Sequence, residues 1–278
     1  NYTQNGIRFK QANICAFVSN LFMKRVKENK KWTMFCPAKA VLNGDKLYGK
    51  SGHQFEILYE KMEVEAEKRK SAFNKVFAQI VSMEKNINSG IGDEKYFIEY
   101  QMLKIEKQRL RKNLIAFKTL DARDIYKIIC DMNNKSSMPY IVYRDPVNYK
   151  NNMKNIGQCE GLNLCLEIIE PSTPDSIASC NLGHINLKKF VKCAYDPSKK
   201  WSEMYDFELL GQASRSLTNN INKVIDYNYY PLDQRDSEGN VTKKGKISTP
   251  NFQNRPLGIG VSGLAEVFAL LSIPYESP

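Results

Sequence analysis

The sequence predicts an α/β fold, in which short apolar strands alternate with amphipathic helices, and three observations support this prediction. Met138–Tyr143 is a short apolar run that ends just before Asp145-Pro146, as a buried strand does. Leu162–Glu170 alternates apolar and polar side chains for most of its length, which is typical of a half-buried strand. A helical stripe follows Asp206 and comprises Phe207, Leu210, Leu217, Ile221 and Val224. Strands and helices interleaved in this way favour an α/β class.

The first half of the chain is dominated by helical patterns. A helix is expected up to about residue 37, with Ile14, Phe17, Val18, Leu21, Phe22 and Val26 near helical spacing, and Trp32–Pro37 as a short extended piece at its end. Residues 54–118 read as two antiparallel helices that are broken at Ser89–Asp93 and bury their apolar faces against each other. The charged residues between these faces are expected to face solvent, although a docking surface for another protein stays open.

The remaining elements follow from caps and turn residues. Asp121 is a plausible N-cap for a helix that ends near Asn133-Asn134. Asp206 is a plausible N-cap for the helix that begins at Phe207. A second strand beginning near Cys180 would bring that cysteine close to Cys165, with His184 expected as a satisfied core residue. Residues 232–254 predict a surface loop. Gly258–Gly263 matches a dinucleotide fingerprint in letters only, because no apolar strand precedes it, so nicotinamide or flavin binding is not expected.

Composition limits the classes of function. With 42% hydrophobic and 26% charged residues, the chain is expected to be soluble and globular, without a membrane span or signal peptide. The net charge of +11 is spread along the whole chain, which does not favour a nucleic-acid partner. Seven scattered cysteines without a Cys-x-x-Cys pair, and only two histidines, argue against a zinc site or a secreted disulfide scaffold and favour a reducing cytoplasm. The absence of an initiator Met suggests a fragment of a longer protein.

The alternating run carries the reactive side chains. If Leu162–Glu170 is extended, Asn163, Cys165 and Glu167 share one face, so that an amide, a thiol and a carboxylate line up. The simpler interpretation is an amphipathic strand with three unrelated polar residues facing outward. Spacing alone leaves both interpretations open.

Several motifs in matching order resemble the large subunit of ribonucleotide reductases. The run Asn163-Leu164-Cys165-Leu166-Glu167-Ile168 is similar to the active-site finger loop of that family. The others are Leu21–Val26, Trp32 through Cys36-Pro37, Pro139-Tyr140 with Tyr143 and Asp145, Cys180-Asn181-Leu182, Asn228–Pro231, and Arg255-Pro256 through Gly258–Val261 and Gly263–Ala265. Only about 54–118 and 232–254 fall outside this likeness, and both are expected to be expansions of shorter family segments.

The resemblance implies that residues 1–278 are the central part of a ten-stranded α/β barrel, with the finger loop threaded through it and a helical hairpin inserted at 54–118. It also implies a role for each matching residue. Cys165 would become a thiyl radical that removes the 3′ hydrogen of the ribose, and Glu167 would take the 3′ hydroxyl proton. Asn163 would hydrogen-bond the ribose hydroxyls, and Leu164 would line the substrate site. Cys180 would be one of two thiols that supply electrons, its partner lying upstream of this chain.

The implied reaction is the reduction of ribonucleoside diphosphates to 2′-deoxyribonucleoside diphosphates. The family uses a radical from a small subunit with a di-metal centre, ATP and deoxynucleotide effectors, thioredoxin or glutaredoxin as reductant, and a homodimer of large subunits. No cofactor or metal is expected to bind in this segment, which is expected to be inactive alone. Two alternatives stay open: a cobalamin-dependent relative, and a non-catalytic paralogue or split-gene fragment that binds a partner through 54–118.

A shielded radical site is also expected from the loop itself. A thiyl radical must be kept from solvent, which suits a cysteine between Leu164 and Leu166 inside a barrel. Two positions depart from the family pattern: Leu162 replaces a residue that is usually small and polar, and Gly161 stands where a cysteine is often found.

Overall fold

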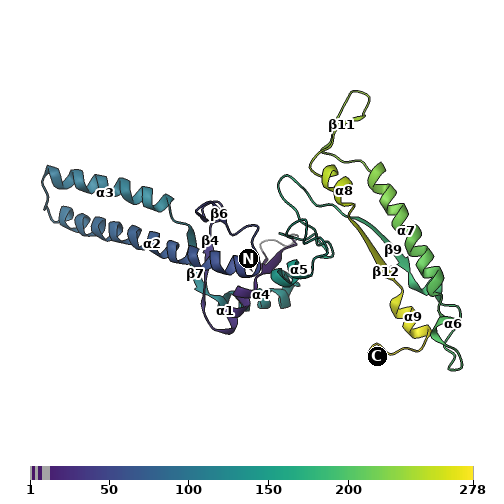
Figure 1. The fold of residues 1–278 in the computed structure, drawn as a ribbon. Helices are drawn as coiled ribbons and strands as arrows, with labels where there is room; N and C mark the ends of the chain where they lie inside the picture. Colours follow the sequence, from purple (N-terminus) through teal and green to yellow (C-terminus); the bar gives the residue numbers. More distant parts are fainter. Residues whose placement is uncertain (1, 4–5, 8–12, 278) are drawn as a thin grey trace. The chain divides into compact units, whose positions relative to one another are not determined.

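The computed structural model describes residues 2–3, 6–7 and 13–277 (Figure 1). The chain forms two compact units, one up to Leu164 and one from Cys165 onward. Each unit contains a pair of parallel strands with helices packed on it, so the predicted α/β class fits the described residues. No sheet among the described residues has more than two strands, so they do not form a closed barrel.

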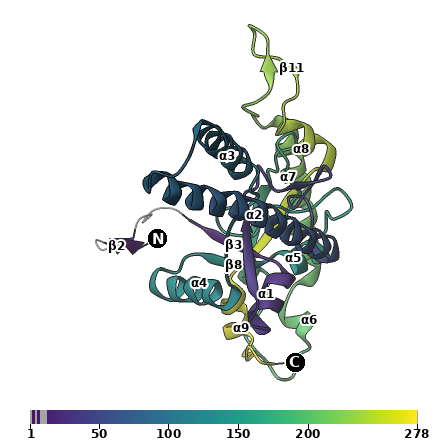
Figure 2. The same ribbon diagram turned by 90° about the vertical axis from the view of Figure 1, so that its left-hand side faces the viewer.

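The parallel pair of the first unit is β3 (Cys15–Val18) and β8 (Tyr140–Tyr143), with Cys15 opposite Tyr140. The connection between these strands includes α1 (Asn20–Lys27) and α4 (Ala122–Ser136), which contact each other (Figure 2). Val18, Phe22 and Ala122 are buried between the strand pair and the two helices. Ser19 caps α1 by accepting a hydrogen bond from the Phe22 N–H at 3.2 Å.

An antiparallel pair, β4 (Lys31–Phe35) and β7 (Ala116–Asp121), borders the long helical hairpin. Tyr59 of α2 fixes this pair, since its ring stacks on Trp32 at 4.3 Å between centroids. Its hydroxyl donates to the Thr33 carbonyl oxygen and accepts from the Thr33 N–H, each at 2.7 Å. Short antiparallel pairs complete the unit: β1 (Tyr2–Thr3) with β2 (Gly6–Ile7), and β5 (Val41–Leu42) with β6 (Asp45–Lys46).

The predicted hairpin is formed by α2 (Gly52–Asn88) and α3 (Glu94–Lys112), with the break at the predicted position. Polar bonds join the helices: the Tyr100 hydroxyl donates to Glu84 at 2.8 Å, and the Asn86 amide donates to the Tyr96 hydroxyl at 3.0 Å. The expectation of a well-buried interface is wrong for α3, because none of its residues is buried. Phe117 lies within the predicted hairpin 54–118, but it belongs to β7 and is 80% exposed.

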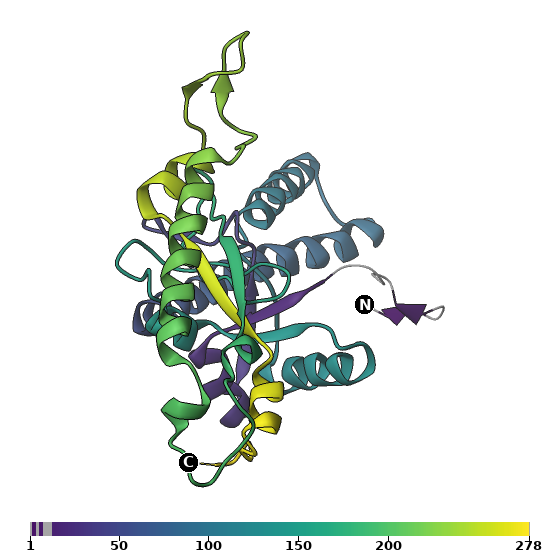
Figure 3. The same cartoon turned by 90° about the vertical axis from the view of Figure 1, so that its right-hand side faces the viewer.

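The second unit is built on β9 (Asn181–Asn186) and β12 (Leu257–Ser262), parallel strands with Asn181 opposite Leu257. The connection between them contains α7 (Phe207–Tyr227), which lies along the strand pair (Figure 3). Gly183 favours close packing of α7 on β9, because a Cβ atom at this position would lie 2.8 Å from the end of the Ile221 side chain, which would have to shift. As predicted, Asp206 caps α7 by accepting from the Leu209 N–H at 2.9 Å.

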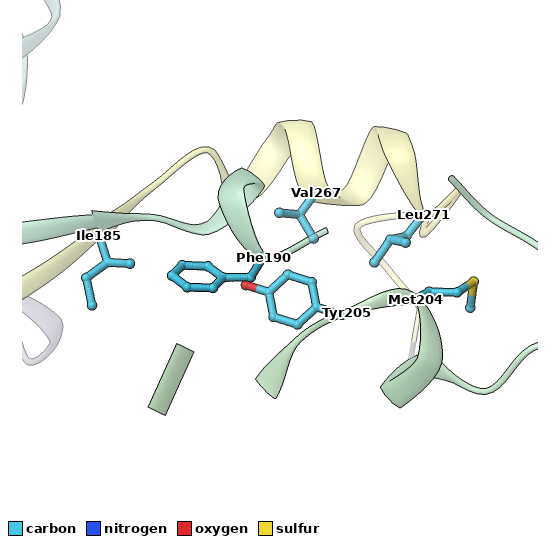
Figure 4. Packing of buried hydrophobic residues seen from close by; sticks show 6 residues of the cluster. All are labelled: Ile185, Phe190, Met204, Tyr205, Val267 and Leu271. Atoms are coloured by element: carbon cyan, nitrogen blue, oxygen red, sulfur yellow. The ribbon is translucent and has the colours of Figure 1, made fainter. Parts of the chain in front are cut away.

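One apolar cluster packs beside the C-terminal ends of β9 and β12 (Figure 4). The short 3₁₀ helix η1 (Leu187–Phe190), α6 (Trp201–Met204) and α9 (Leu264–Leu270) contribute to it. The buried members of the cluster are Ile185, Phe190, Met204, Tyr205, Val267 and Leu271. The cluster anchors the C-terminal ends of β9 and β12, and so holds the two strands in register.

Four segments differ from the sequence predictions. Residues 15–18 are a strand rather than the start of a helix, and other parts of that predicted helix lie outside the described residues. Residues 144–150 form helix α5 (Arg144–Lys150) rather than a turn, since Pro146 lies in the first helical turn, where its missing N–H costs nothing. The predicted loop 232–254 contains β10 (Gln234–Arg235), β11 (Val241–Lys243) and α8 (Ser248–Asn254). Ser248 and Asn251 of α8 are buried, so this end of the segment is not a surface loop.

The fourth difference concerns Leu162–Glu170, which is not a strand. The partner of β9 is therefore β12 and not this run. No described helix is long and apolar enough to cross a membrane.

Candidate active site

The run Leu162–Glu170 turns at Leu164-Cys165 instead of continuing as an extended strand. Leu166 has a φ of 67°, a left-handed conformation that L-residues other than Asn, Asp and Gly rarely adopt. This turn breaks the two-residue alternation, so the predicted shared face of Asn163, Cys165 and Glu167 is wrong as a strand face. A strained backbone at reactive residues is often part of a functional loop.

The boundary between the two compact units falls inside this loop. Asn163 and Leu164 belong to the first unit, and Cys165 and Glu167 to the second. Cys165 is exposed and Leu164 is 59% exposed, so the expected shielding of the thiol is wrong for the described residues. The described sheets have two strands each, so they form no barrel around the thiol.

Glu167 lines a cavity of about 440 Å³ in the second unit. The cavity lies over β9 and β12, and its lining residues are Glu167, Ile168, Leu182, Gly183, His184, Gly258, Ile259 and Gly260. His184 is exposed at this cavity, so the expectation of a core histidine is wrong. The structure thus brings a predicted catalytic carboxylate to the surface of the strand pair that begins beside Cys180.

Glycines of β12 make room for the side chains of β9. A Cβ atom at Gly258 would lie 2.8 Å from the Leu182 side chain and 3.6 Å from the Cys180 sulfur. Leu257–Ser262 is itself a strand, so Gly258 and Gly260 of the fingerprint-like motif lie within the sheet, and only Gly263 is at the start of helix α9. The role of Gly258 is therefore close packing beside the thiol.

Cys180 lies directly before β9 and is hydrogen-bonded to the Glu170 carboxylate. Burial is the main cause that raises the pKa of the Cys180 thiol to about 11, and the negative charge of Glu170 and its hydrogen bond add to this effect. The charge of Glu167 contributes in the same direction, so the structure places both carboxylates close enough to act on this thiol. At neutral pH the sulfur is therefore held as the neutral thiol.

Glu170 is the residue that sequence reasoning missed. It is 8% exposed, and burial raises the pKa of its carboxyl, partly offset by hydrogen bonds from the Cys180 thiol and the Ser179 N–H. The alternation contained a signal, because Glu170 follows the spacing of the apolar residues Leu164, Leu166 and Ile168. A carboxylate at a position that the pattern marks as buried calls for a partner.

A metal site is not part of this arrangement. Among residues 13–277, no group of three or more His, Cys, Asp or Glu side chains could hold a metal ion. None of the seven cysteines, which all lie within the described residues, forms a disulfide in the structure.

Comparison with known proteins identifies the family. A family model described as "Ribonucleotide reductase, barrel domain" matches residues 1–278. The chain belongs to this family. It is 34% identical to the ribonucleoside-diphosphate reductase large subunit of Plasmodium falciparum (isolate Dd2) over 277 residues, covering 100% of this chain and 26% of that protein.

Two further relatives support the same assignment. The large subunit from Caenorhabditis elegans is 31% identical over 97% of this chain, and that from Arabidopsis thaliana is 30% identical over 94%. The chain spans about a quarter of the length of these relatives, 25% and 26% respectively. Their names do not favour the alternatives of a cobalamin-dependent enzyme or a non-catalytic partner-binding module.

Proposed function

We propose that this chain is the catalytic segment of a ribonucleoside-diphosphate reductase large subunit. The reaction is the reduction of ribonucleoside diphosphates to 2′-deoxyribonucleoside diphosphates for DNA precursor synthesis. The observation that carries the proposal is the set of reactive residues in a chain that belongs to the reductase family. Asn163, Cys165 and Glu167 lie in one loop, and Cys180 follows them in the sequence.

The chemistry starts at Cys165. Its sulfur, as a thiyl radical, removes the 3′ hydrogen of the ribose, and Glu167 accepts the proton of the 3′ hydroxyl as a general base. Asn163 holds the ribose hydroxyls by hydrogen bonds, and Leu164 contacts the substrate. Cys180 and a second cysteine supply two electrons and become a disulfide.

Two structural features support these roles. Glu167 lines a cavity large enough to admit part of a sugar, and its charge acts on the Cys180 thiol. The Cys180 thiol is neutral at physiological pH, the form that a hydrogen donor needs. Cys165 is exposed next to sheets of only two strands, which is consistent with a barrel whose other strands would surround the loop.

The proposal includes the wider assembly. In a full-length protein the two strand pairs would be part of a ten-stranded barrel around the loop, with 54–118 and 232–254 as expansions of segments that are shorter in the family. The radical would come from a small subunit with a di-metal centre, and ATP and deoxynucleotides would act as effectors. Thioredoxin or glutaredoxin would reduce the disulfide, and the large subunit would act as a homodimer in the cytoplasm.

Substitution of the thiyl cysteine tests the proposal. Cys165→Ser in the full-length protein, supplied with its radical-generating subunit, is expected to abolish formation of deoxyribonucleoside diphosphate, because a hydroxyl cannot form the hydrogen-abstracting radical. Cys130→Ser is the matched control, since Cys130 is a partly buried thiol on α4 that has no role in the proposed chemistry. Product formation by the Cys165→Ser protein at the wild-type rate would show the enzymatic assignment to be wrong.

A further inference from the structure

The buried Glu170 and the partly buried Cys180 form a hydrogen-bonded pair, in which only Glu170 has no role in the proposed reaction. The Glu170 side chain is one of the few buried charged groups of the second unit, with 8% of its surface exposed. The groups that hydrogen-bond its carboxylate are the Cys180 thiol and the Ser179 N–H. Among the described residues, no lysine, arginine or histidine forms an ion pair with the Glu170 carboxylate.

The surroundings of the thiol leave Glu170 as its closest titratable partner. The charged groups that act on the Cys180 sulfur are Glu170 and, more weakly, Glu167. The Asn181 carbonyl oxygen lies 3.8 Å from the sulfur, and Gly258 of β12 lies against it on the neighbouring strand. His184 is on β9, the strand that follows Cys180, and lines the cavity. A proton that leaves or reaches this sulfur therefore meets Glu170 first.

We propose that Glu170 is the acid–base partner of Cys180, which returns a proton to its sulfur each time the redox disulfide is reduced. This inference rests on the proposed function, because it assigns Cys180 to a disulfide. The high proton affinity of the Cys180 sulfur makes it a poor leaving group as a thiolate, so an adjacent acid would speed its release. Burial brings the proton affinity of Glu170 closer to that of the thiol.

The bonds and protons of the step balance as follows. Reduction of one ribonucleotide breaks two S–H bonds and forms one S–S bond, and the two electrons and two protons convert the 2′ carbon–oxygen bond into a carbon–hydrogen bond and water. An external dithiol then loses a proton, which Glu170 accepts, and its thiolate bonds to the sulfur of the second cysteine. The S–S bond breaks with its electron pair on Cys180, and Glu170 passes the proton to that sulfur.

The second thiol of the external dithiol completes the exchange. Its sulfur attacks the mixed disulfide, the second cysteine leaves, and the remaining proton of the dithiol goes to that cysteine. Glu170 ends as a carboxylate that accepts a hydrogen bond from the Cys180 thiol, in agreement with the hydrogen bond between these two side chains in the structure.

Thiol alkylation tests the pair without any turnover. In the full-length, reduced protein, the rate of Cys180 alkylation by iodoacetamide is measured by mass spectrometry from pH 7 to 10. Glu170→Gln removes the carboxylate charge, so the midpoint of this profile is expected to fall by about one pH unit, with alkylation at pH 8 about tenfold faster. Glu170→Asp, which keeps a carboxylate, is expected to restore part of the wild-type midpoint.

A charge change elsewhere in the same unit is the control. Glu266→Gln removes an exposed carboxylate that pairs with Lys188, and it is expected to leave the Cys180 profile unchanged. Equal midpoints for wild type and Glu170→Gln would overturn the inference. A midpoint shift of equal size in Glu170→Gln and Glu170→Asp would do the same, because it would indicate a packing role for the side chain.

Turnover kinetics separate this inference from the proposed function. With thioredoxin or dithiothreitol as reductant, Glu170→Gln is expected to slow re-reduction of the disulfide by about 10²-fold, while the pre-reduced protein still forms its first product. If the wild-type protein forms no product, the proposed function fails, and the alkylation profiles still decide the role of Glu170. If the wild type is active and re-reduction in Glu170→Gln is as fast as in wild type, the acid–base role fails alone.

Discussion

Two buried carboxylates, one in each unit, have the same exposure and opposite uses. Asp145 and Glu170 are each 8% exposed. Asp145 accepts hydrogen bonds from the Asn20 N–H at 2.6 Å and the Gly52 N–H at 2.7 Å, so both of its oxygens are engaged by backbone at the first turns of α1 and α2. Glu170 instead accepts from a thiol and a single backbone N–H.

The difference separates a structural carboxylate from a chemical one. Asp145 binds backbone N–H donors, which do not ionise at physiological pH, and it lies at the positive ends of two helix dipoles. Its bonds join α5, α1 and α2, three elements that are far apart in sequence. Glu170 binds a group that can exchange a proton, and no helix N-terminus or cation is recorded as stabilising its charge in the described structure. Burial alone therefore does not distinguish architecture from chemistry, whereas the type of donor does.

Substitution of Asp145 is expected to have the largest effect on stability. Asp145→Ala leaves the Asn20 and Gly52 N–H groups without their partner, and loss of two bonds to a charged acceptor is expected to cost about 3 kcal/mol. Hydrogen–deuterium exchange of peptides containing Asn20 and Gly52 measures this loss as exchange that is about 10²-fold faster. Asp131→Ala, at an exposed position of α4, is the control and is expected to change exchange little. Unchanged protection in Asp145→Ala would remove the structural half of the comparison.

Tyr59 provides a second test of the first unit, with a smaller effect. Tyr59→Phe keeps the ring stacked on Trp32 but removes the hydroxyl that bonds both the N–H and the carbonyl of Thr33. Leaving these buried backbone groups unpaired is expected to cost about 2 kcal/mol. Exchange of the Thr33 amide should therefore accelerate about thirtyfold. An exchange rate equal to that of wild type would mean that water replaces the hydroxyl without cost.

The contribution of Glu170 to stability is expected to depend on pH in the opposite direction from that of a carboxylate paired with a cation. Its pKa is raised in the folded protein, so the folded state binds more protons than the unfolded state above the ordinary glutamate pKa of about 4.3. Stability from this group is therefore present at acid pH and is lost as pH rises through the raised value. Relative to Glu170→Gln, the wild-type second unit should lose protection as pH rises above the ordinary glutamate pKa of about 4.3.

The measurement is hydrogen exchange of the peptide containing Ser179, corrected for the intrinsic pH dependence of exchange. A difference between wild type and Glu170→Gln that stays constant with pH would contradict a raised pKa. An increase of wild-type protection with pH would indicate a cation partner for Glu170 and would place it in the same class as Asp145.

The sequence predicted those elements whose pattern is local. The stripe from Phe207 to Val224 and the break at Ser89–Asp93 were enough to place α7 and the α2–α3 hairpin, because helical periodicity over many turns is hard to mistake. Short elements failed: the apolar residues before Ser19 fit a helix or a strand equally well, and Asp145-Pro146 suggests a turn although proline is tolerated in a first helical turn.

The candidate site depends on contacts that no local pattern contains. The pairing of β9 with β12 joins Asn181 and Leu257 across the whole of α7, and it is this pairing that brings Gly258 against the Cys180 sulfur. Glu170 could be suspected from its place in the alternation, but its partner could not, because the turn at Leu166 abolishes the strand on which the pattern relied. The roles assigned to Asn163, Cys165, Glu167 and Cys180 came from resemblance, and they stay predictions.

The smallest expected effect belongs to an exposed ion pair in the second unit. Lys188 and Glu266 are 2.7 Å apart, and both side chains are about half exposed. Solvent screens such a pair and side-chain entropy opposes it, so Lys188→Ala is expected to change the free energy of unfolding by no more than about 0.5 kcal/mol. Exchange of the peptides covering η1 and α9, measured at low and at 0.5 M salt, should be nearly the same for the variant and wild type. A loss as large as that of Asp145→Ala would mean that exposure does not predict the worth of a charge in this protein, and the contrast between the two buried carboxylates would then need another explanation.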